Sequence, residues 1–369
     1  MQTTKITTFQ FLVLVTFFSI GTSILVLPST LAIGAKQDAW ISAIIGTVVG
    51  VFIVWLYTKI ALWFPNLNYT QLNEKIFGKW IGKLTSLVLI ITTILYTAAL
   101  LTYGGFFLNT EMLPATPLPI ISILNCLVLI ISVRLGFDTF ARAAEIFIFV
   151  FFFLFILLVI FLIPKIDIGN LEPFFYTSFT TVSKSSLQLI ADSSLNSIVL
   201  LMIFPTLIHN TKNAIKSFLL GKIIGGVVLI VITGLCIFVL GSHETASKVY
   251  PSYVLAKQVS IGGFVNRIEG SMAALWVLAL FIKTGLYFYV SLIGLAQIFG
   301  LKDYKAIVLP LSAAVMGLSI TMFPNIIDQQ KFDRTTSVSL SIIIGLFIPM
   351  LLSVVYLFRR KKLQQEKEV

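Results

Sequence analysis

Residues 19–25 read Ser-Ile-Gly-Thr-Ser-Ile-Leu, near the middle of a long apolar run that starts at Thr8, and Pro28 follows them. Glycine, hydroxyl side chains and a proline without a backbone donor all interrupt regular helical hydrogen bonding. Inside a membrane, such an interruption is tolerated only where it faces protein or a water-filled cavity. The stretch therefore predicts a helix that is broken near the bilayer centre.

A second polar stretch interrupts a later apolar run. Residues 192–197 read Asp-Ser-Ser-Leu-Asn-Ser, and Pro205 comes eight residues after Ser197, much as Pro28 comes seven after Gly21. Interrupted segments at corresponding positions of two inverted halves point to a central binding site. Close packing of small residues is the alternative explanation for either break alone. The two breaks together, with an ionisable Asp192, favour a ligand site.

The composition places the chain in a lipid bilayer. Of its 369 residues, 58% are hydrophobic and 11% are charged, against about 45–50% and about 25% in soluble domains. Too few polar side chains remain to cover a water-soluble globule, which excludes a single soluble fold. A spanning helix needs about 20 apolar residues. Ten candidate spans meet this length, at residues 8–33, 39–63, 84–107, 117–133, 140–163, 186–208, 215–240, 269–299, 304–323 and 336–358.

These runs predict an all-α polytopic membrane protein, because they lack the period-two alternation of barrel strands. The first and sixth spans are the broken ones, which predicts a five-plus-five inverted repeat. We expect one integral membrane domain, with repeats at 1–164 and 186–358 and a basic tail at 359–369. A secretory signal is the alternative for the first run, but nine further spans follow it.

The basic residues lie in short clusters between the apolar runs. Although the net charge is +11, this distribution is typical of membrane loops, so no nucleic-acid partner is expected. With the N-terminus inside, 17 Lys and Arg residues, Lys222 among them, fall on the inner side and 8 on the outer side. Because basic loops remain in the cytoplasm, both termini are predicted to be cytoplasmic.

Two connections are long enough to carry structure. Residues 66–83 predict an interfacial amphipathic helix on the inner side, anchored by Trp80. Residues 241–266 predict a lid-like re-entrant or surface helix on the outer side, with a plain loop as the alternative.

The sequence lacks the patterns that carry catalysis or metal binding. Cys126 and Cys236 fall within spans, where a thiol packs as a small apolar group, and His209 and His243 are far apart. No metal, no cofactor and no disulfide framework is therefore predicted. Because no acid, base and nucleophile converge in a soluble segment, we do not expect an enzyme.

The eighth span carries an unusual lysine. Lys283 lies fourteen positions beyond Glu269, about 21 Å along a helix, which is too far for an easy escape to the outer surface. An ammonium group at that depth is a functional-site hypothesis by default, and Tyr287 lies on the same helix face. The alternative is a structural ammonium that caps carbonyls of a neighbouring broken helix. Arg267 and Glu269 predict an interfacial salt bridge.

Four features together resemble the B subunit of spore germinant receptors. They are the 21–25 run with Leu27-Pro28, Gly-Lys-Trp-Ile-Gly at 78–82, Arg267-x-Glu269 followed by Trp276, and the basic C-terminal end. The resemblance covers essentially the whole chain. That family belongs with the amino acid, polyamine and organocation transporters, so it implies an amino-acid-permease-like fold.

The resemblance implies a subunit of the spore inner membrane that detects a small germinant, commonly an amino acid. It also implies two partners, a larger membrane A subunit and a lipoprotein C subunit. In relatives the pocket is lined by positions that match Gly21, Lys283 and Tyr287. This chain departs from the pattern in two places. The position of Lys283 holds an uncharged hydroxyl in some relatives. The sixth span carries Asn196, Ser197 and Val199 where the family pattern has a glycine and an acidic residue.

The leading hypothesis is a sensor whose germinant lies between the two breaks. Amides after Gly21 are expected to hold a carboxylate, the second break to offer carbonyls, Tyr287 to gate or orient the ligand, and Lys283 to stand where related transporters bind a cation. The predicted ligand-binding residues are Gly21, Thr22, Ser23, Ile24, Ser194, Asn196, Ser197, Lys283, Thr284 and Tyr287. An amino-acid permease, with a proton passing through Lys283, is the main alternative, and a passive scaffold of the receptor is another.

Overall fold

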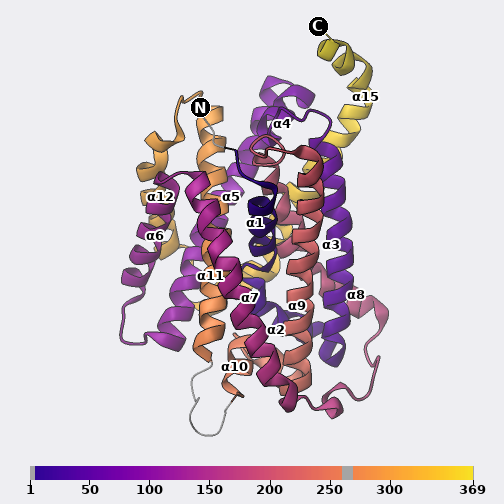
Figure 1. Cartoon of the computed structure of the whole chain (residues 1–369), viewed down its shortest axis with the longest axis vertical. Helices are drawn as coiled ribbons and strands as arrows, with labels where there is room; N and C mark the ends of the chain where they lie inside the picture. Colours follow the sequence, from indigo (N-terminus) through magenta and orange to yellow (C-terminus); the bar gives the residue numbers. More distant parts are fainter. Residues whose placement is uncertain (1–4, 260–268, 369) are drawn as a thin grey trace.

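The computed structural model describes residues 5–259 and 269–368, which form a bundle of long helices joined by short connections (Figure 1). The α-helices are α1 (Thr8–Ile20), α2 (Ser23–Ala35), α3 (Ala39–Ala61), α4 (Tyr69–Phe77), α5 (Lys79–Phe107), α6 (Leu118–Arg134), α7 (Phe137–Leu162), α8 (Phe179–Leu189), α9 (Thr211–Ser247), α10 (Pro251–Lys257), α11 (Glu269–Ile298), α12 (Val308–Thr321), α13 (Ile326–Phe332), α14 (Val338–Ile342) and α15 (Ile348–Glu368).

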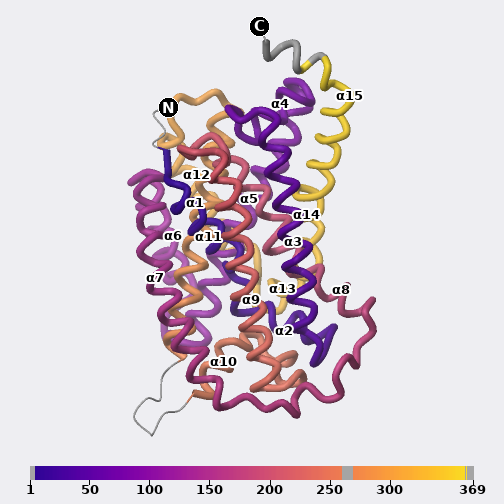
Figure 2. Tube along the Cα trace, turned by 45° about the vertical axis from the view of Figure 1, so that its right-hand side comes forward, coloured from indigo at the N-terminus to yellow at the C-terminus, as the bar shows by residue number. Residues whose placement is uncertain are grey.

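The helical stretches follow the predicted spans, and the all-α polytopic fold is confirmed. Among the described residues, seven stretches are long and apolar enough to cross a membrane, and α1 and α6 are shorter apolar helices. The number differs from ten because α2 and α3 are counted as one stretch, because the windings of the sixth span divide it into shorter elements, and because α6, with 17 residues, is shorter than the other spanning helices. The division into repeats at 1–164 and 186–358 stays a prediction. The first described residues and the end of α15 lie at the same end of the bundle (Figures 1 and 2).

The first broken segment consists of α1 and α2. Gly21 separates them with φ 37° and ψ −127°, a conformation that glycine adopts freely and other residues rarely do. Its amide still donates to the Phe17 carbonyl at 2.7 Å, which completes α1, and α2 begins at Ser23. Pro28 lies inside α2. The break is therefore made by Gly21 and not by the proline.

The second broken segment changes its helical winding instead of opening a gap. After α8 the chain forms a π-helical turn, η5 (Ile190–Ser194), and then a 3₁₀ stretch, η6 (Leu195–Met202). Both windings shift carbonyl oxygens away from the usual i+4 donors. The polar run that the sequence marked as a break therefore changes the backbone hydrogen-bond pattern at this depth.

The two broken segments are joined at one end of the bundle. Ile6 donates its amide to the Leu207 carbonyl at 2.8 Å and forms an isolated parallel bridge with Ile208. Helix α9 packs against α1, α2 and α3, while α11 packs against α5, α7 and α1. The breaks are thereby enclosed by α5, α9 and α11 at the core of the bundle.

Both long connections differ from their predictions in detail. Helix α4 is short and ends before Gly78, whose φ is 92°, so Trp80 belongs to the first turn of α5 and the predicted single interfacial helix is wrong. Trp80 is 83% exposed. On the other connection, Gly241 bends α9 with φ 77°, and α10 packs against α9 and α11. Residues 260–266 and Arg267, with its predicted bridge to Glu269, lie outside the described residues.

Candidate functional site

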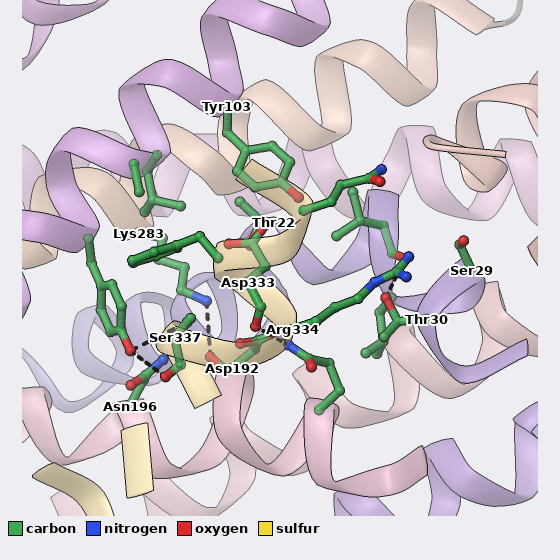
Figure 3. A pocket seen from close by; sticks show the side chains of 18 of the residues that line it. Thr22, Ser29, Thr30, Tyr103, Asp192, Asn196, Lys283, Asp333, Arg334 and Ser337 are labelled. Atoms are coloured by element: carbon green, nitrogen blue, oxygen red, sulfur yellow. Dashed lines mark hydrogen bonds between the residues drawn. The ribbon is translucent and has the colours of Figure 1, made fainter. Parts of the chain in front are cut away.

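A cavity of about 70 Å³ lies between the two broken segments (Figure 3). It is lined by α5, α11 and the turn η8 (Asp333–Ser337) as well as by both breaks. Its polar lining comprises Thr22, Ser29, Thr30, Tyr96, Tyr103, Gln188, Asp192, Asn196, Lys283, Tyr287, Gln330, Asp333, Arg334 and Ser337. Because drug-sized ligands occupy about 300–1,000 Å³, this cavity suits a small guest unless its walls move apart.

The predicted ligand-binding residues fall into two groups. Thr22, Asn196, Lys283 and Tyr287 line the cavity. The other six predicted residues are not part of its lining, and they are Gly21, Ser23, Ile24, Ser194, Ser197 and Thr284. Thr284 lines a separate, mainly apolar cavity of about 310 Å³ between α5, α6, α7 and α11.

Lys283 reaches the cavity across the first break. Its side chain passes so close to Gly21 that a Cβ built there would lie 2.2 Å from Lys283 Cδ. Lys283 is 3% exposed, and its Nζ donates to the main-chain oxygen of Asp192 at 3.1 Å. Phe18 lies beneath the ammonium, with Nζ 5.3 Å from the ring centroid. The ammonium therefore caps a carbonyl of the second broken segment, which is the structural arrangement that the sequence left open beside a ligand-binding role.

Lys222 is a residue of this region that sequence reasoning misplaced. It was counted among the basic residues of the inner side, although it falls within the predicted span 215–240, and it is fully buried within α9. Its Nζ donates to the carbonyl oxygen of Ser193 at 2.9 Å and to Ser193 Oγ at 2.6 Å. Ser193 Oγ in turn donates to the Ser19 carbonyl at 2.9 Å. One buried ammonium thus connects α9 to both broken segments.

Glycines around Lys222 were the signal for its burial. A Cβ on Gly221 would lie 2.7 Å from the Leu12 carbonyl, and one on Gly225 would lie 2.6 Å from Ser19 Cβ. Glycines spaced four residues apart let α9 approach α1 closely. A lysine between them has no path to solvent and must find oxygen acceptors inside the bundle.

Carbonyls of the second segment accept hydrogen bonds from side chains. Besides the two lysines, the Ser197 hydroxyl donates to the Ser194 carbonyl, while the single proton of the Tyr57 hydroxyl is shared between the Leu195 carbonyl and the nearer Gly345 carbonyl. The three consecutive carbonyls from residue 192 to residue 194 therefore each accept from a side chain of their own. A ligand in the cavity meets side chains of this segment, and not its carbonyls.

The tenth segment, which consists here of η8 and α14, contributes polar residues to the site that the sequence did not predict. Ser341 donates to Asn196 Oδ1 at 2.9 Å, and the Tyr96 hydroxyl donates to the Ser337 carbonyl at 2.9 Å. Asp333 and Arg334, which precede the predicted span 336–358, line the cavity (Figure 3). The polar run Asp-Arg-Thr-Thr-Ser at 333–337 was the available signal.

Two further residues that line the cavity are Gln188 and Tyr287. The Gln188 amide donates to Asp192 Oδ2 at 2.9 Å and to the Asp333 carbonyl at 3.2 Å, which links the sixth and tenth segments. The Tyr287 hydroxyl is buried and has no hydrogen-bond partner among the described residues. A buried hydroxyl without a partner costs free energy. Tyr287 thus offers an unused donor and acceptor to a guest.

Metal chemistry has little basis in the described ranges. Cys126 and Cys236 are free and buried. Within residues 5–259 and 269–368, no group of three or more His, Cys, Asp or Glu is placed to hold a metal ion.

The sequence matches known spore germination proteins along its whole length. The profile described as spore germination protein matches residues 5–329. Spore germination protein KB of Bacillus subtilis (strain 168) is 25% identical over 371 residues, covering 100% of this chain and 98% of that protein. Spore germination protein GerLB of Bacillus cereus is 25% identical over 332 residues, covering 88% of this chain and 87% of that protein.

Solved transporter-fold structures share the architecture. Mhp1, a nucleobase-cation-symport-1 family transporter solved closed with bromovinylhydantoin bound, superposes with a TM-score of 0.68 over 97% of this chain and 80% of its own. MhsT, solved in complex with L-phenylalanine, superposes with a TM-score of 0.69 over 97% of this chain and 99% of its own. At 12% identity each, these likenesses show a shared fold alone.

These comparisons confirm the resemblance to germinant-receptor B subunits and the amino-acid-permease-like fold. Neither the relatives nor Mhp1 is described as an enzyme, in line with the expectation from the sequence. The chain is therefore an integral membrane protein, and it belongs to the spore germination protein family whose profile covers residues 5–329.

Proposed function

We propose that this chain is the ligand-sensing B subunit of a spore germinant receptor, and that a small germinant, most simply an amino acid, binds between the two broken segments. The observation that carries the proposal is the cavity that contacts Thr22 in the first segment and Asn196 in the second. Irregular backbone at this depth faces a polar cavity, as the physics of membranes requires. The ligands bound to MhsT and Mhp1, in the same fold, add support by analogy.

Binding triggers germination in this proposal by favouring one arrangement of the bundle. A ligand shifts a conformational equilibrium only by its difference in affinity for the two states. The small volume of the cavity supports a contracted resting state, in which a guest must separate the sixth and tenth segments held together by Gln188. The A and C subunits of the receptor are the proposed recipients of this movement, in the spore inner membrane with both termini cytoplasmic.

A working amino-acid permease is the second candidate, because the chain shares the fold of the transporter Mhp1. Deletion of the chain, followed by a germination screen across amino acids, nucleosides and sugars, tests the sensor. Loss of the response to one compound supports it. Changed uptake of labelled amino acid by growing cells, or uptake into proteoliposomes by the purified chain alone, supports the permease instead.

A further inference from the structure

Two carboxylates face the cavity from different segments. Asp192 belongs to η5 and Asp333 to η8, and both lie at the centre of the site (Figure 3). Gln188 holds the two positions together through its bonds to Asp192 Oδ2 and to the Asp333 carbonyl. This places two acids from distant parts of the sequence against one small cavity.

The cations of the site form no close ion pair with these acids in the described ranges. Lys283 donates to the main-chain oxygen of Asp192, and Lys222 donates to Ser193. Within the described ranges, no ion pair of 4 Å or less joins a lysine or arginine nitrogen to the carboxylate of Asp192 or Asp333. Asp333 Oδ2 is enclosed and has no hydrogen-bond partner in the same part of the chain.

An enclosed carboxylate inside a membrane protein requires a compensating partner. Without one it must take up a proton or attract a cation, because transfer of an unpaired charge from water is strongly unfavourable. The buried hydroxyl of Tyr287, which has no hydrogen-bond partner among the described residues and lines the same cavity, independently points to a hydrogen-bonding guest. The strongest acceptors for a positively charged guest are these carboxylates, since they carry charge and the break carbonyls from residue 192 to residue 194 each already accept from a side chain.

We propose that Asp192 and Asp333 form an ammonium subsite, so that the ligand of this cavity carries a primary amine. The proposal rests on the proposed function, because it assumes that a ligand binds between the broken segments. It assigns the ligand class as amino acids or other small amines, and excludes sugars, nucleosides and carboxylic acids that lack an amine. Arg334 at the cavity rim is available for a carboxylate on the same ligand.

The test uses the purified full chain in detergent and the shift of its unfolding temperature on titration with matched probes. L-alanine, L-valine and L-lysine carry the amine. L-lactate and 2-hydroxyisovalerate replace it with a hydroxyl, and inosine and D-glucose represent neutral germinants. Asp333→Asn and Asp192→Asn remove the charges with little change in shape. Asp328→Asn is the matched control, because Asp328 lies exposed on α13, outside the cavity.

The expected result is stabilisation by at least one amine and by none of the amine-free probes. Each cavity variant should raise the half-saturating concentration by about 10-fold or more, as expected for loss of a charge-assisted hydrogen bond, and Asp328→Asn should leave it unchanged. One outcome would overturn the ammonium subsite but support ligand binding in the cavity. In that outcome lactate, inosine or glucose stabilises the chain, the stabilisation persists in Asp333→Asn, and Thr22→Trp abolishes it. Binding that survives Thr22→Trp, or the absence of binding by every probe, counts against both proposals.

Discussion

The side chain of Lys283 crosses the first helix break directly over Gly21, where an added Cβ would lie 2.2 Å from Lys283 Cδ. Gly21 also has a positive φ of 37°. The residue that breaks the helix therefore also makes room for the buried ammonium that caps the second broken segment.

Replacement of Gly21 by alanine is expected to disrupt this crossing. The methyl group meets both an unfavourable φ and the lysine stem, so we expect a loss of about 2 kcal/mol or more in the free energy of unfolding and a failed germinant response. Gly21→Ala combined with Lys283→Ala should recover part of the stability, because the clash is then removed. Gly317→Ala is the control, since nothing lies within 4 Å of its added Cβ. Equal unfolding temperatures for Gly21→Ala and the wild type would refute the crossing.

Replacement of Lys283 by methionine tests the ammonium itself. Methionine keeps much of the stem but cannot donate to the Asp192 carbonyl, so we expect normal membrane insertion with an abolished or altered germinant response. The checks are immunoblots of spore membranes and germination curves across germinant concentrations. An unchanged concentration dependence would dismiss a role for the ammonium.

Replacement of Lys222 by methionine tests whether α9 positions the second broken segment, from outside the lining of the cavity. Lys222 does not line the cavity, yet its ammonium fixes Ser193 next to Asp192. We expect a loss of about 1–3 kcal/mol from the unpaired Ser193 carbonyl, together with a higher germinant concentration for half-maximal response. Lys216→Met, exposed on the same helix, should change neither quantity. A variant that is less stable but has wild-type ligand dependence would make Lys222 purely structural.

Replacement of Tyr287 by phenylalanine separates ligand contact from stability. Because the hydroxyl is buried without a partner among the described residues, its removal should leave the unfolding temperature unchanged or raise it slightly. The germinant response should nevertheless weaken by about 10-fold, since a ligand hydrogen bond is lost. Tyr289→Phe, which alters a ring packed on Phe137 away from the cavity, serves as the control. The idea fails when both variants shift the germinant response equally.

The backbone of the site was predictable from the sequence because it depends on local chemistry. Gly21 and the polar residues 192–197 interrupt long apolar runs, and such interruptions are easily recognised in the sequence of a membrane-spanning segment. The same reasoning placed Lys283 deep in the bundle, and the structure shows it buried. Ten spans were predicted, although the windings of the broken segments were not, since π and 3₁₀ turns depend on side-chain donors from other helices.

The side-chain contacts of the site were not predictable, because they depend on how helices are rotated against one another. Lys222 was counted on the inner side from its charge, although it falls within the predicted span 215–240, and close packing of α9 on α1 carries it inside. Ser194 and Ser197 were expected to face a ligand, and they lie outside the lining of the cavity. Asp333 was missed because hydropathy leaves it in the connection before the predicted span 336–358, while the fold places it beside the sixth segment.

The central claim is that a small polar ligand binds between the two broken segments, and an experimental structure of the purified chain with its screened germinant tests it most directly. The account predicts ligand density in contact with Thr22 and Tyr287 and within hydrogen-bond distance of Asp192 or Asp333. Density at any other position, with the space between Thr22 and Asn196 unchanged at saturating ligand, would contradict it.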